Sequence, residues 1–257
     1  MEPVSEALLI SIGTTHPWNI AGVGLDARIA ADRGLAAAAV IVAVSAQDAS
    51  GLRAVESVSP QLLRAQLEAL PNPVSAYCVG ALISSENARI VAEFLAARSD
   101  RAPVVIDPVL RASLGGELQT DRTLAQTLRE RMLPLGAIVT PNLSEAALLA
   151  GVEARDEAGM LQAARVIVSS GAFAALVTGG HLAGEPVDVL VTASREERIS
   201  GPRLDGDMRG SGGTLAACLA CELASGNDVY AAATRAQAYV RERIAAGTKR
   251  GGLQVAF

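Results

Sequence analysis

Short apolar runs alternate with longer amphipathic segments along most of the chain. The runs are rich in valine and isoleucine and predict strands at 7–13, 36–45, 76–82, 104–107, 137–140 and 174–177. The amphipathic segments predict helices at 25–34, 59–69, 84–97, 121–132, 156–170 and 229–246, with a further helix after the turn at 210–214. This alternation is typical of βαβ units. We therefore expect an α/β fold, doubly wound, with a mostly parallel sheet and helices on both faces.

Two stretches depart from the alternation. The runs at 187–192 and 196–200 predict a hairpin, inserted locally as an antiparallel pair. The tail from 247 to 257 contains two glycines next to Lys249 and Arg250 and is predicted to be loop. No repeat, low-complexity block or linker divides the chain, so we expect a single domain over 1–257.

Composition narrows the class of partner. The 257 residues are 50% hydrophobic and only 3% aromatic, so alanine, valine and leucine must fill the core. A net charge of -5 and a pI near 5.2 argue against nucleic acid or an anionic membrane as the main partner. The longest apolar run, 35–44, is too short for a membrane helix of roughly 20 residues. With no charged-then-apolar leader at the amino terminus, we expect a cytoplasmic protein.

A glycine-rich turn at 209–214, Arg-Gly-Ser-Gly-Gly-Thr, runs directly into an apolar helix. The first N–H groups of such a helix have no partner within it, and with the helix dipole they favour an anion such as phosphate. Glycine also lets the backbone approach a ligand closely. The alternative is a Gly-Ser turn that only caps an ordinary helix.

Polar residues follow three of the predicted strands. They are Asp107-Pro108, Thr140-Pro141-Asn142 and Thr178-Gly179-Gly180. Because the carboxyl ends of parallel strands share one edge of a doubly wound sheet, these residues should converge on one site with the glycine-rich turn. A buried carboxylate at Asp107 is costly without a cation or hydrogen-bond donors, which favours a ligand or metal role.

Other polar residues have two interpretations. Asn142 and Glu145 have the spacing of a helix capping box, and Glu145 could equally hold Mg²⁺ through water. Asp26 and Gln47, near the ends of the first two βα connections, read as ordinary surface residues. We interpret the two histidines, His16 and His181, as packed or solvated side chains. We interpret the three cysteines as small buried residues.

Several motifs in order resemble the ribokinase-like superfamily. Within it the chain is most similar to the hydroxymethylpyrimidine/phosphomethylpyrimidine kinases of thiamine biosynthesis, with pyridoxal-type kinases as the next alternative. The resemblance covers nearly the whole length. The matching stretches are PWNIAGVGLD at 17–26 (family pattern DPSGGAGIQAD), AQD at 46–48, VVIDPVLRASLG at 104–115, TPNLSEAA at 140–147, VTGGHL at 177–182 and RGSGGT at 209–214 (family pattern HGTGCT).

The resemblance implies an ATP-dependent kinase that uses Mg²⁺, acts on 4-amino-5-hydroxymethyl-2-methylpyrimidine or its phosphate, and forms a homodimer. The hairpin at 187–200 is one candidate dimer contact. The implied substrate-binding residues are Asp26 and Gln47 at the aminopyrimidine edge, with Thr14, Ala21, Ala81 and Val109. The implied metal residues are Asp107 and Glu145, and the nucleotide-binding residues are Asn142, Thr178, Gly180 and Thr214. The implied catalytic turn is Gly210, Ser211, Gly212 and Gly213.

Three positions depart from the family pattern. Gly213 stands where these kinases have cysteine, and sugar kinases an aspartate base, while Thr178 replaces a lysine. The segment His16-Pro17-Trp18-Asn19-Ile20 replaces an acidic residue, proline and a Ser-Gly-Gly run. A second hypothesis is therefore a non-catalytic descendant that binds a pyrimidine or a nucleotide. Asp205 and Asp207 are candidates for a replacement carboxylate.

Overall fold

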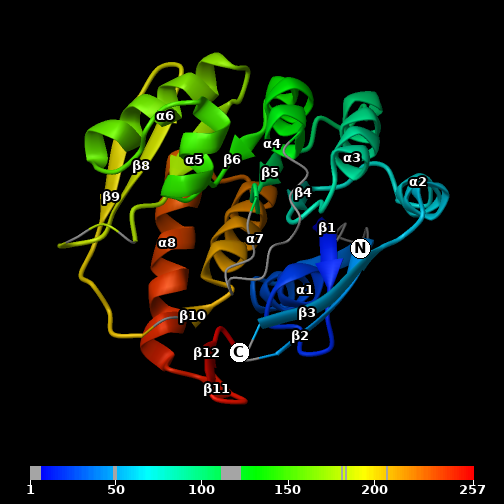
Figure 1. Ribbon diagram of the computed structural model, residues 1–257, viewed down its shortest axis with the longest axis horizontal. Helices are drawn as coiled ribbons and strands as arrows, with labels where there is room; N and C mark the ends of the chain where they lie inside the picture. The colour runs from blue at the N-terminus through cyan, green and yellow to red at the C-terminus, as the bar shows by residue number, and fades with distance from the viewer. Residues whose placement is uncertain (1–6, 49–50, 111–122, 181, 183, 207) are drawn as a thin grey trace, which may run out of the picture.

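A nine-stranded sheet forms the centre of the molecule, in the order β3-β2-β1-β4-β5-β6-β7-β8-β9 (Figure 1). The computed structural model describes residues 7–48, 51–110, 123–180, 182, 184–206 and 208–257. The strands of this sheet are β1 (Leu8–Thr15), β2 (Ala36–Asp48), β3 (Gly51–Ser57), β4 (Ala76–Val79), β5 (Val104–Ile106), β6 (Ile138–Val139), β7 (Ala174–Val177), β8 (Val187–Thr192) and β9 (Glu196–Ser200). Strands β2, β1, β4, β5, β6 and β7 pair in parallel, which confirms the doubly wound prediction.

Helices cover both faces of this sheet (Figure 1). Alternate residues of each strand point to opposite faces. Leu9 on β1 thus packs in the cluster with α1, α7 and α8, while its neighbour Ile10 packs in the other cluster with α2 to α6. The helices are α1 (Gly22–Asp32), α2 (Pro60–Glu68), α3 (Ser85–Ala97), α4 (Thr123–Thr127), α5 (Leu143–Ala150), α6 (Glu157–Ser169), α7 (Ser211–Ala224) and α8 (Val229–Ala246). Helix α4 continues as a π turn over Leu128–Met132 and a 3₁₀ turn over Leu133–Leu135.

The structure departs from the predicted elements at three places. Strand β3 was not predicted, yet it pairs antiparallel with β2 at one edge of the sheet. The predicted antiparallel hairpin is confirmed as β8–β9, but it is no separate insertion, because β8 also pairs antiparallel with β7 and extends the main sheet. The tail is not loop: β11 (Lys249–Arg250) and β12 (Leu253–Val255) form a second sheet with β10 (Met208–Arg209). Short pairings of this kind depend on distant partners and leave little local signal.

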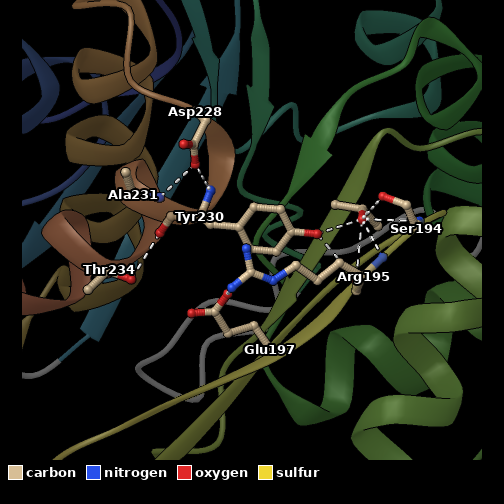
Figure 2. A network of polar contacts seen from close by, with 8 residues as sticks. Ser194, Arg195, Glu197, Asp228, Tyr230, Ala231 and Thr234 are labelled. Carbon is tan, nitrogen blue, oxygen red and sulfur yellow. Dashed lines mark hydrogen bonds and ion pairs between the residues drawn. The ribbon is translucent and has the colours of Figure 1, made fainter.

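Side chains cap the starts of several helices. Ser59, with Pro60 behind it, and Ser84 accept hydrogen bonds from first-turn N–H groups of α2 and α3. Asp228 caps α8 in the same way and lies in a polar cluster that joins α8 to the β8–β9 turn (Figure 2). There the hydroxyl groups of Tyr230 and Thr192 are 2.7 Å apart, and the guanidinium of Arg195 lies 4.2 Å from the Tyr230 ring centroid.

All three cysteines are free and buried, as expected for small core residues. Within the part of the chain that the structure describes, no helix is both long and apolar enough to span a bilayer.

Candidate active site

The carboxyl edge of the parallel sheet brings the strand-end residues together. Hydrogen bonds continue beyond the strands: Asp107 N–H donates to the Val79 carbonyl at 2.8 Å, and Thr140 N–H to Ile106 at 2.9 Å. The same ladder reaches Thr178, whose N–H donates to the Pro141 carbonyl at 2.9 Å. The ladder therefore places Asp107, Asn142 and Thr178 along one edge, since Asn142 and Thr178 also form a parallel bridge.

The glycine-rich turn starts α7 in the conformation that its sequence requires. Gly210 has φ of +80°, and a Cβ there would overlap the Ile20 carbonyl oxygen, so only glycine fits. The N–H and Oγ1 of Thr214 both donate to the Gly210 carbonyl at 2.8 Å. The N–H groups of Ser211, Gly212 and Gly213 precede this first helical bond and have no acceptor within the helix. The turn therefore presents an array of donors that suits an anion.

Asp107 faces this turn. A Cβ built on Gly212 would lie 3.7 Å from the Asp107 Oδ2 atom, with no closer neighbour. Burial raises the pKa of Asp107 well above its usual range, and the negative charges of Glu145 and Asp26 raise it further. At the next position, Gly213, none of the described atoms lies within 4 Å of a built Cβ. The described residues therefore leave space for a side chain at this glycine.

Glu145 is buried and forms the capping box that its spacing predicted. Its Oε2 accepts from Asn142 N–H at 3.0 Å, and Asn142 Oδ1 accepts from Glu145 N–H at 3.1 Å. Its other oxygen accepts from Leu110 N–H at 3.4 Å. Burial raises the pKa of Glu145 to about 7, although hydrogen bonds from Asn142 and Leu110 oppose the shift. The capping role is confirmed, and the metal role stays a prediction.

A divalent cation fits the chemistry of this acidic pair. Asp107 and Glu145 supply hard oxygen donors. A positive charge would offset the burial that raises the pKa values of both and the repulsion by Glu145 that raises the pKa of Asp107 further. No group of three or more acidic, histidine or cysteine side chains forms a cage within the described ranges. A cation here would therefore draw further ligands from phosphate oxygens and water, as Mg²⁺ commonly does.

Asp26 is buried, so the prediction that it is an ordinary surface residue was wrong. It lies on the face of α1 that packs against β1, and its Oδ2 accepts from Ser11 Oγ at 2.6 Å. Burial raises its pKa to about 7, against hydrogen bonds from Ser11 and Cys78. Gln47 is half-buried on β2 and pairs with Leu52 of β3, so it does not lie in a βα connection.

The loop from Thr14 to Gly22 holds the predicted small-molecule residues on a tightly packed backbone. Gly22 has φ of +62°, and a Cβ there would overlap the Thr14 carbonyl. Ala21 N–H donates to His16 Nε2 at 3.2 Å. His16 is buried, and burial together with the charge of Arg209 lowers its pKa, which keeps the ring a neutral acceptor. His16 is therefore a packed loop residue, as predicted.

The remaining residues predicted for the small molecule lie beyond β4 and β5. Ala81 is half-buried two residues after the end of β4. Val109 N–H donates to the Asp107 carbonyl at 2.8 Å. A narrow cleft lies between these strand ends, and its lining includes Gly80, Asp107 and Val109. Val109 thus borders the same cleft as the acidic residue.

The loop after β7 is held by groups that the sequence did not single out. Gly179 N–H donates to the buried Asp188 Oδ1 at 2.8 Å, and Gly180 has no atom within 4 Å of a built Cβ. Arg203 donates from Nη1 to the Gly180 carbonyl at 3.1 Å and from Nε to Gly184 at 2.9 Å. Arg203 and Gly180 are 23 residues apart in the sequence, so no local motif predicts their contact.

Of the two candidates for a replacement carboxylate, only Asp205 lies in the described part of the chain. Asp205 is exposed in the segment before β10. His181 and Asp207 lie outside the described residues. No replacement carboxylate is therefore identified among the described residues of that segment.

The chain is similar to known kinases over nearly its full length. The family model described as phosphomethylpyrimidine kinase matches residues 19–256. The hydroxymethylpyrimidine/phosphomethylpyrimidine kinase of Streptomyces coelicolor is 36% identical over 253 residues, covering 97% of this chain and 93% of that protein. The crystal structure of phosphomethylpyrimidine kinase from Clostridium difficile has a TM-score of 0.80 at 26% identity, covering 93% of this chain and 100% of that one. The Bacillus subtilis pyridoxal kinase in its ADP complex has a TM-score of 0.84 at 27% identity, covering 93% and 92%. This chain belongs to the phosphomethylpyrimidine kinase family.

Proposed function

We propose that this protein transfers the γ-phosphoryl group of ATP, with Mg²⁺, to 4-amino-5-hydroxymethyl-2-methylpyrimidine or to the phosphate of that compound. The observation that carries this proposal is the position of Asp107 opposite the glycine turn, where a carboxylate and an array of N–H donors face the same space. Relatives named hydroxymethylpyrimidine/phosphomethylpyrimidine kinase supply the substrate class.

Phosphoryl transfer depends chiefly on position and charge, and the site supplies both. The N–H groups of Ser211, Gly212 and Gly213 hold the transferred phosphoryl oxygens, and Thr178, Gly180 and Thr214 border the rest of the phosphate chain. Asp107 and Glu145, with Asn142, would hold Mg²⁺, which neutralises phosphate charge when bound. The substrate oxygen attacks the γ-phosphorus while the bond from that phosphorus to the β–γ bridging oxygen breaks. ADP leaves with the bridging oxygen, and the proton of the substrate hydroxyl passes to water. Gly213 offers no base, so this step is slowed rather than prevented.

In this proposal the small-molecule substrate binds at the carboxyl edge of the parallel sheet, at the end nearest α1. Asp26, whose pKa is raised to about 7, and Gln47 would bond the aminopyrimidine edge, since a carboxyl and an amide both donate and accept. Thr14, Ala21, Ala81 and Val109 would surround the ring.

Single-turnover transfer of the γ-phosphoryl group from Mg-ATP to hydroxymethylpyrimidine tests the proposal. We expect product from the native chain and a rate about 10²–10³-fold lower for Asp107→Asn, the scale of one lost electrostatic group. Asp156→Asn is the matched control, because Asp156 caps α6 and asparagine caps equally well. Pyrimidine binding without any product from the native chain would contradict the proposal and favour a binding protein.

A pyridoxal-type kinase is the second candidate. It is favoured by the altered loop at His16 to Ile20 and by the similarity to the Bacillus subtilis pyridoxal kinase. The ratio of kcat/KM for pyridoxal and for hydroxymethylpyrimidine, measured in competition, decides between the two substrates.

We also propose that the protein is a homodimer and works in the cytoplasm. Strand β9, the outer strand of the suggested hairpin contact, carries charged residues that pair within the chain, as Arg198 does with Glu157 and Glu196 with Arg165. Charged edge strands resist pairing with another chain. We therefore favour the β2–β3 end of the sheet, where Val44 is 53% exposed. Sedimentation velocity of the native chain and of Val44→Lys tests this contact.

A further inference from the structure

The C-terminal hairpin, defined here as β11, the turn Gly251-Gly252 and β12, contacts the loop that carries Ala21. Gly251 has φ of +55°, and a Cβ there would overlap the Cη2 and Cζ3 atoms of Trp18. The indole ring therefore lies directly on the Gly251 backbone. Arg250 adds a hydrogen bond from Nη1 to the Trp18 carbonyl at 3.4 Å.

This hairpin is fixed to the rest of the molecule. Strand β12 pairs in parallel with β10, with Gln254 opposite Met208 and Val255 opposite Arg209. The side chain of Gln254 donates to the Ile244 carbonyl at 2.7 Å near the end of α8. Beyond the hairpin, the ring of Phe257 lies 4.7 Å from the Arg28 guanidinium on α1, the helix that carries Asp26. Figure 1 shows the hairpin beside β10.

The same loop is held from its other side by the glycine-rich turn. Gly210 packs against the Ile20 carbonyl so closely that no Cβ would fit. Strand β10 pairs with β12, and the glycine-rich turn begins where β10 ends, at Arg209. Inside the loop, Asn19 N–H donates to the His16 carbonyl at 3.2 Å. The loop therefore contacts both the glycine-rich turn, which follows β10, and the C-terminal hairpin, which pairs with β10. A displacement of Trp18 would shift its neighbours Ile20 and Ala21.

We infer that the C-terminal hairpin positions the small-molecule end of the site through the contact of Gly251 with Trp18, and so sets the affinity for the heteroaromatic alcohol but not for ATP. The inference rests on the proposed function for the identity of the alcohol. Trp18 is a positioning residue, because it acts through the backbone of Ile20 and Ala21. Trp18 stands where the family pattern has serine, so the contact of an indole ring with Gly251 is a departure from that pattern.

Two glycine variants separate this contact from backbone strain. Gly251 and Gly252 both have positive φ, at +55° and +85°, but only a Cβ on Gly251 meets Trp18, since none of the described atoms lies within 4 Å of one on Gly252. Calorimetry gives the Kd for hydroxymethylpyrimidine and for Mg-ATP. We expect Gly251→Ala to weaken pyrimidine binding about tenfold, below the roughly 10²-fold cost of a full 1 Å misplacement. It should leave Mg-ATP binding within about twofold, and Gly252→Ala should change neither affinity.

Trp18 is the only tryptophan of the chain, so its fluorescence reports the contact directly. Gly251→Ala should shift its emission to the red as the ring leaves the hairpin, and Gly252→Ala should not. In a Trp18→Gly background, adding Gly251→Ala should have no further effect on the pyrimidine Kd, because the contact is already absent.

Equal pyrimidine affinities for the two alanine variants would overturn the inference, even with a shifted emission. So would an additional loss in the Trp18→Gly background. A native chain that binds the pyrimidine but transfers no phosphoryl group would overturn the proposed function and leave this binding test in force. A native chain that does not bind the pyrimidine would overturn both.

Discussion

At the scale of single residues, Gly213 is where the glycine-rich turn departs from the family pattern, which has cysteine at this position. A built Cβ on Gly213 meets no atom of the residues that the structure describes within 4 Å, and the position lies in the first turn of α7. A cysteine there should fit without distortion. We predict that Gly213→Cys raises kcat for pyrimidine phosphorylation, within the roughly 10²–10⁴-fold range of a positioned acid–base group. Steady-state kinetics with saturating Mg-ATP measures the effect.

The matched control is Gly213→Ala, which adds the same Cβ without a thiol. Replacing glycine by alanine inside a helix should stabilise the fold by about 0.5–1 kcal/mol and leave kcat unchanged. A gain in kcat from both variants would mean that helix order limits the rate, and that the thiol contributes no chemistry.

Asp188 makes the stability of the fold depend on pH. Its side chain is 5% exposed, and burial raises its pKa to about 6, although Gly179 N–H and the charge of Arg241 oppose the shift. A carboxyl group with a raised folded pKa stabilises fully below its unfolded pKa, near 4, and loses this contribution as the pH rises through 6. We predict that stability relative to Asp188→Asn falls by at most about 3 kcal/mol between these limits. Urea unfolding of both proteins at pH 4 to 7 measures the difference, and parallel curves would contradict it.

The residues of the site were predictable where the chemistry is local. Asp107 and Thr178 end strands, and Asn142 with Glu145 shows its capping box in four consecutive letters. The burial of Asp26 was not predictable, because it depends on which face of α1 meets β1. The same holds for Arg203, which reaches the loop after β7 from a distant segment.

At the scale of elements, regular βα units were predictable and edge strands were not. The six parallel strands have dense apolar runs because helices bury both of their faces. Strand β3 lies at the edge, and every residue of it after Gly51 is half-buried or exposed, so its apolar signal is weak. Strands β10, β11 and β12 are two or three residues long and exist only through their mutual pairing. Local sequence carries little information about such pairs.

The joint between α8 and the β8–β9 hairpin gives a prediction about an element contact. Tyr230 and Thr192 share a hydrogen bond of 2.7 Å, and the Tyr230 ring also lies against Arg195 (Figure 2). Tyr230→Phe keeps the ring contact and removes only the hydroxyl. We predict a loss of about 1 kcal/mol in unfolding free energy, with kcat/KM unchanged, because the turn that follows β8 is at the end of the strand remote from Asp188 and Gly179. Chemical denaturation with a parallel activity assay checks both parts, and Thr234→Ala, an exposed position nearby, is the control.

At the scale of the whole molecule, one edge of the sheet brings together groups that attract an anion and groups that repel one. The turn before α7 favours an anion, whereas Asp107, which faces the turn, and Glu145, which interacts with Asp107, would each oppose an anion when ionised. A nucleotide triphosphate alone would meet both the attraction and the repulsion. With a divalent cation between phosphates and carboxylates, both interactions become favourable. Nucleotide binding and metal binding should therefore be strongly coupled in this protein.

Thermal unfolding tests that coupling. A ligand at 100 times its Kd adds about 2.7 kcal/mol of stability, which for a chain of this size raises Tm by roughly 5–10 °C. We predict a shift of this size with Mg-ATP and a much smaller one with ATP and a chelator. Asp107→Asn removes a group that repels phosphate when it is ionised, so ATP without metal should stabilise this variant nearly as well as Mg-ATP does. Asp26→Asn, at the pyrimidine end, should keep the metal dependence of the native chain. Equal shifts of the native chain with and without Mg²⁺ would show that the two carboxylates take no part in nucleotide binding, and the glycine turn alone would then account for it.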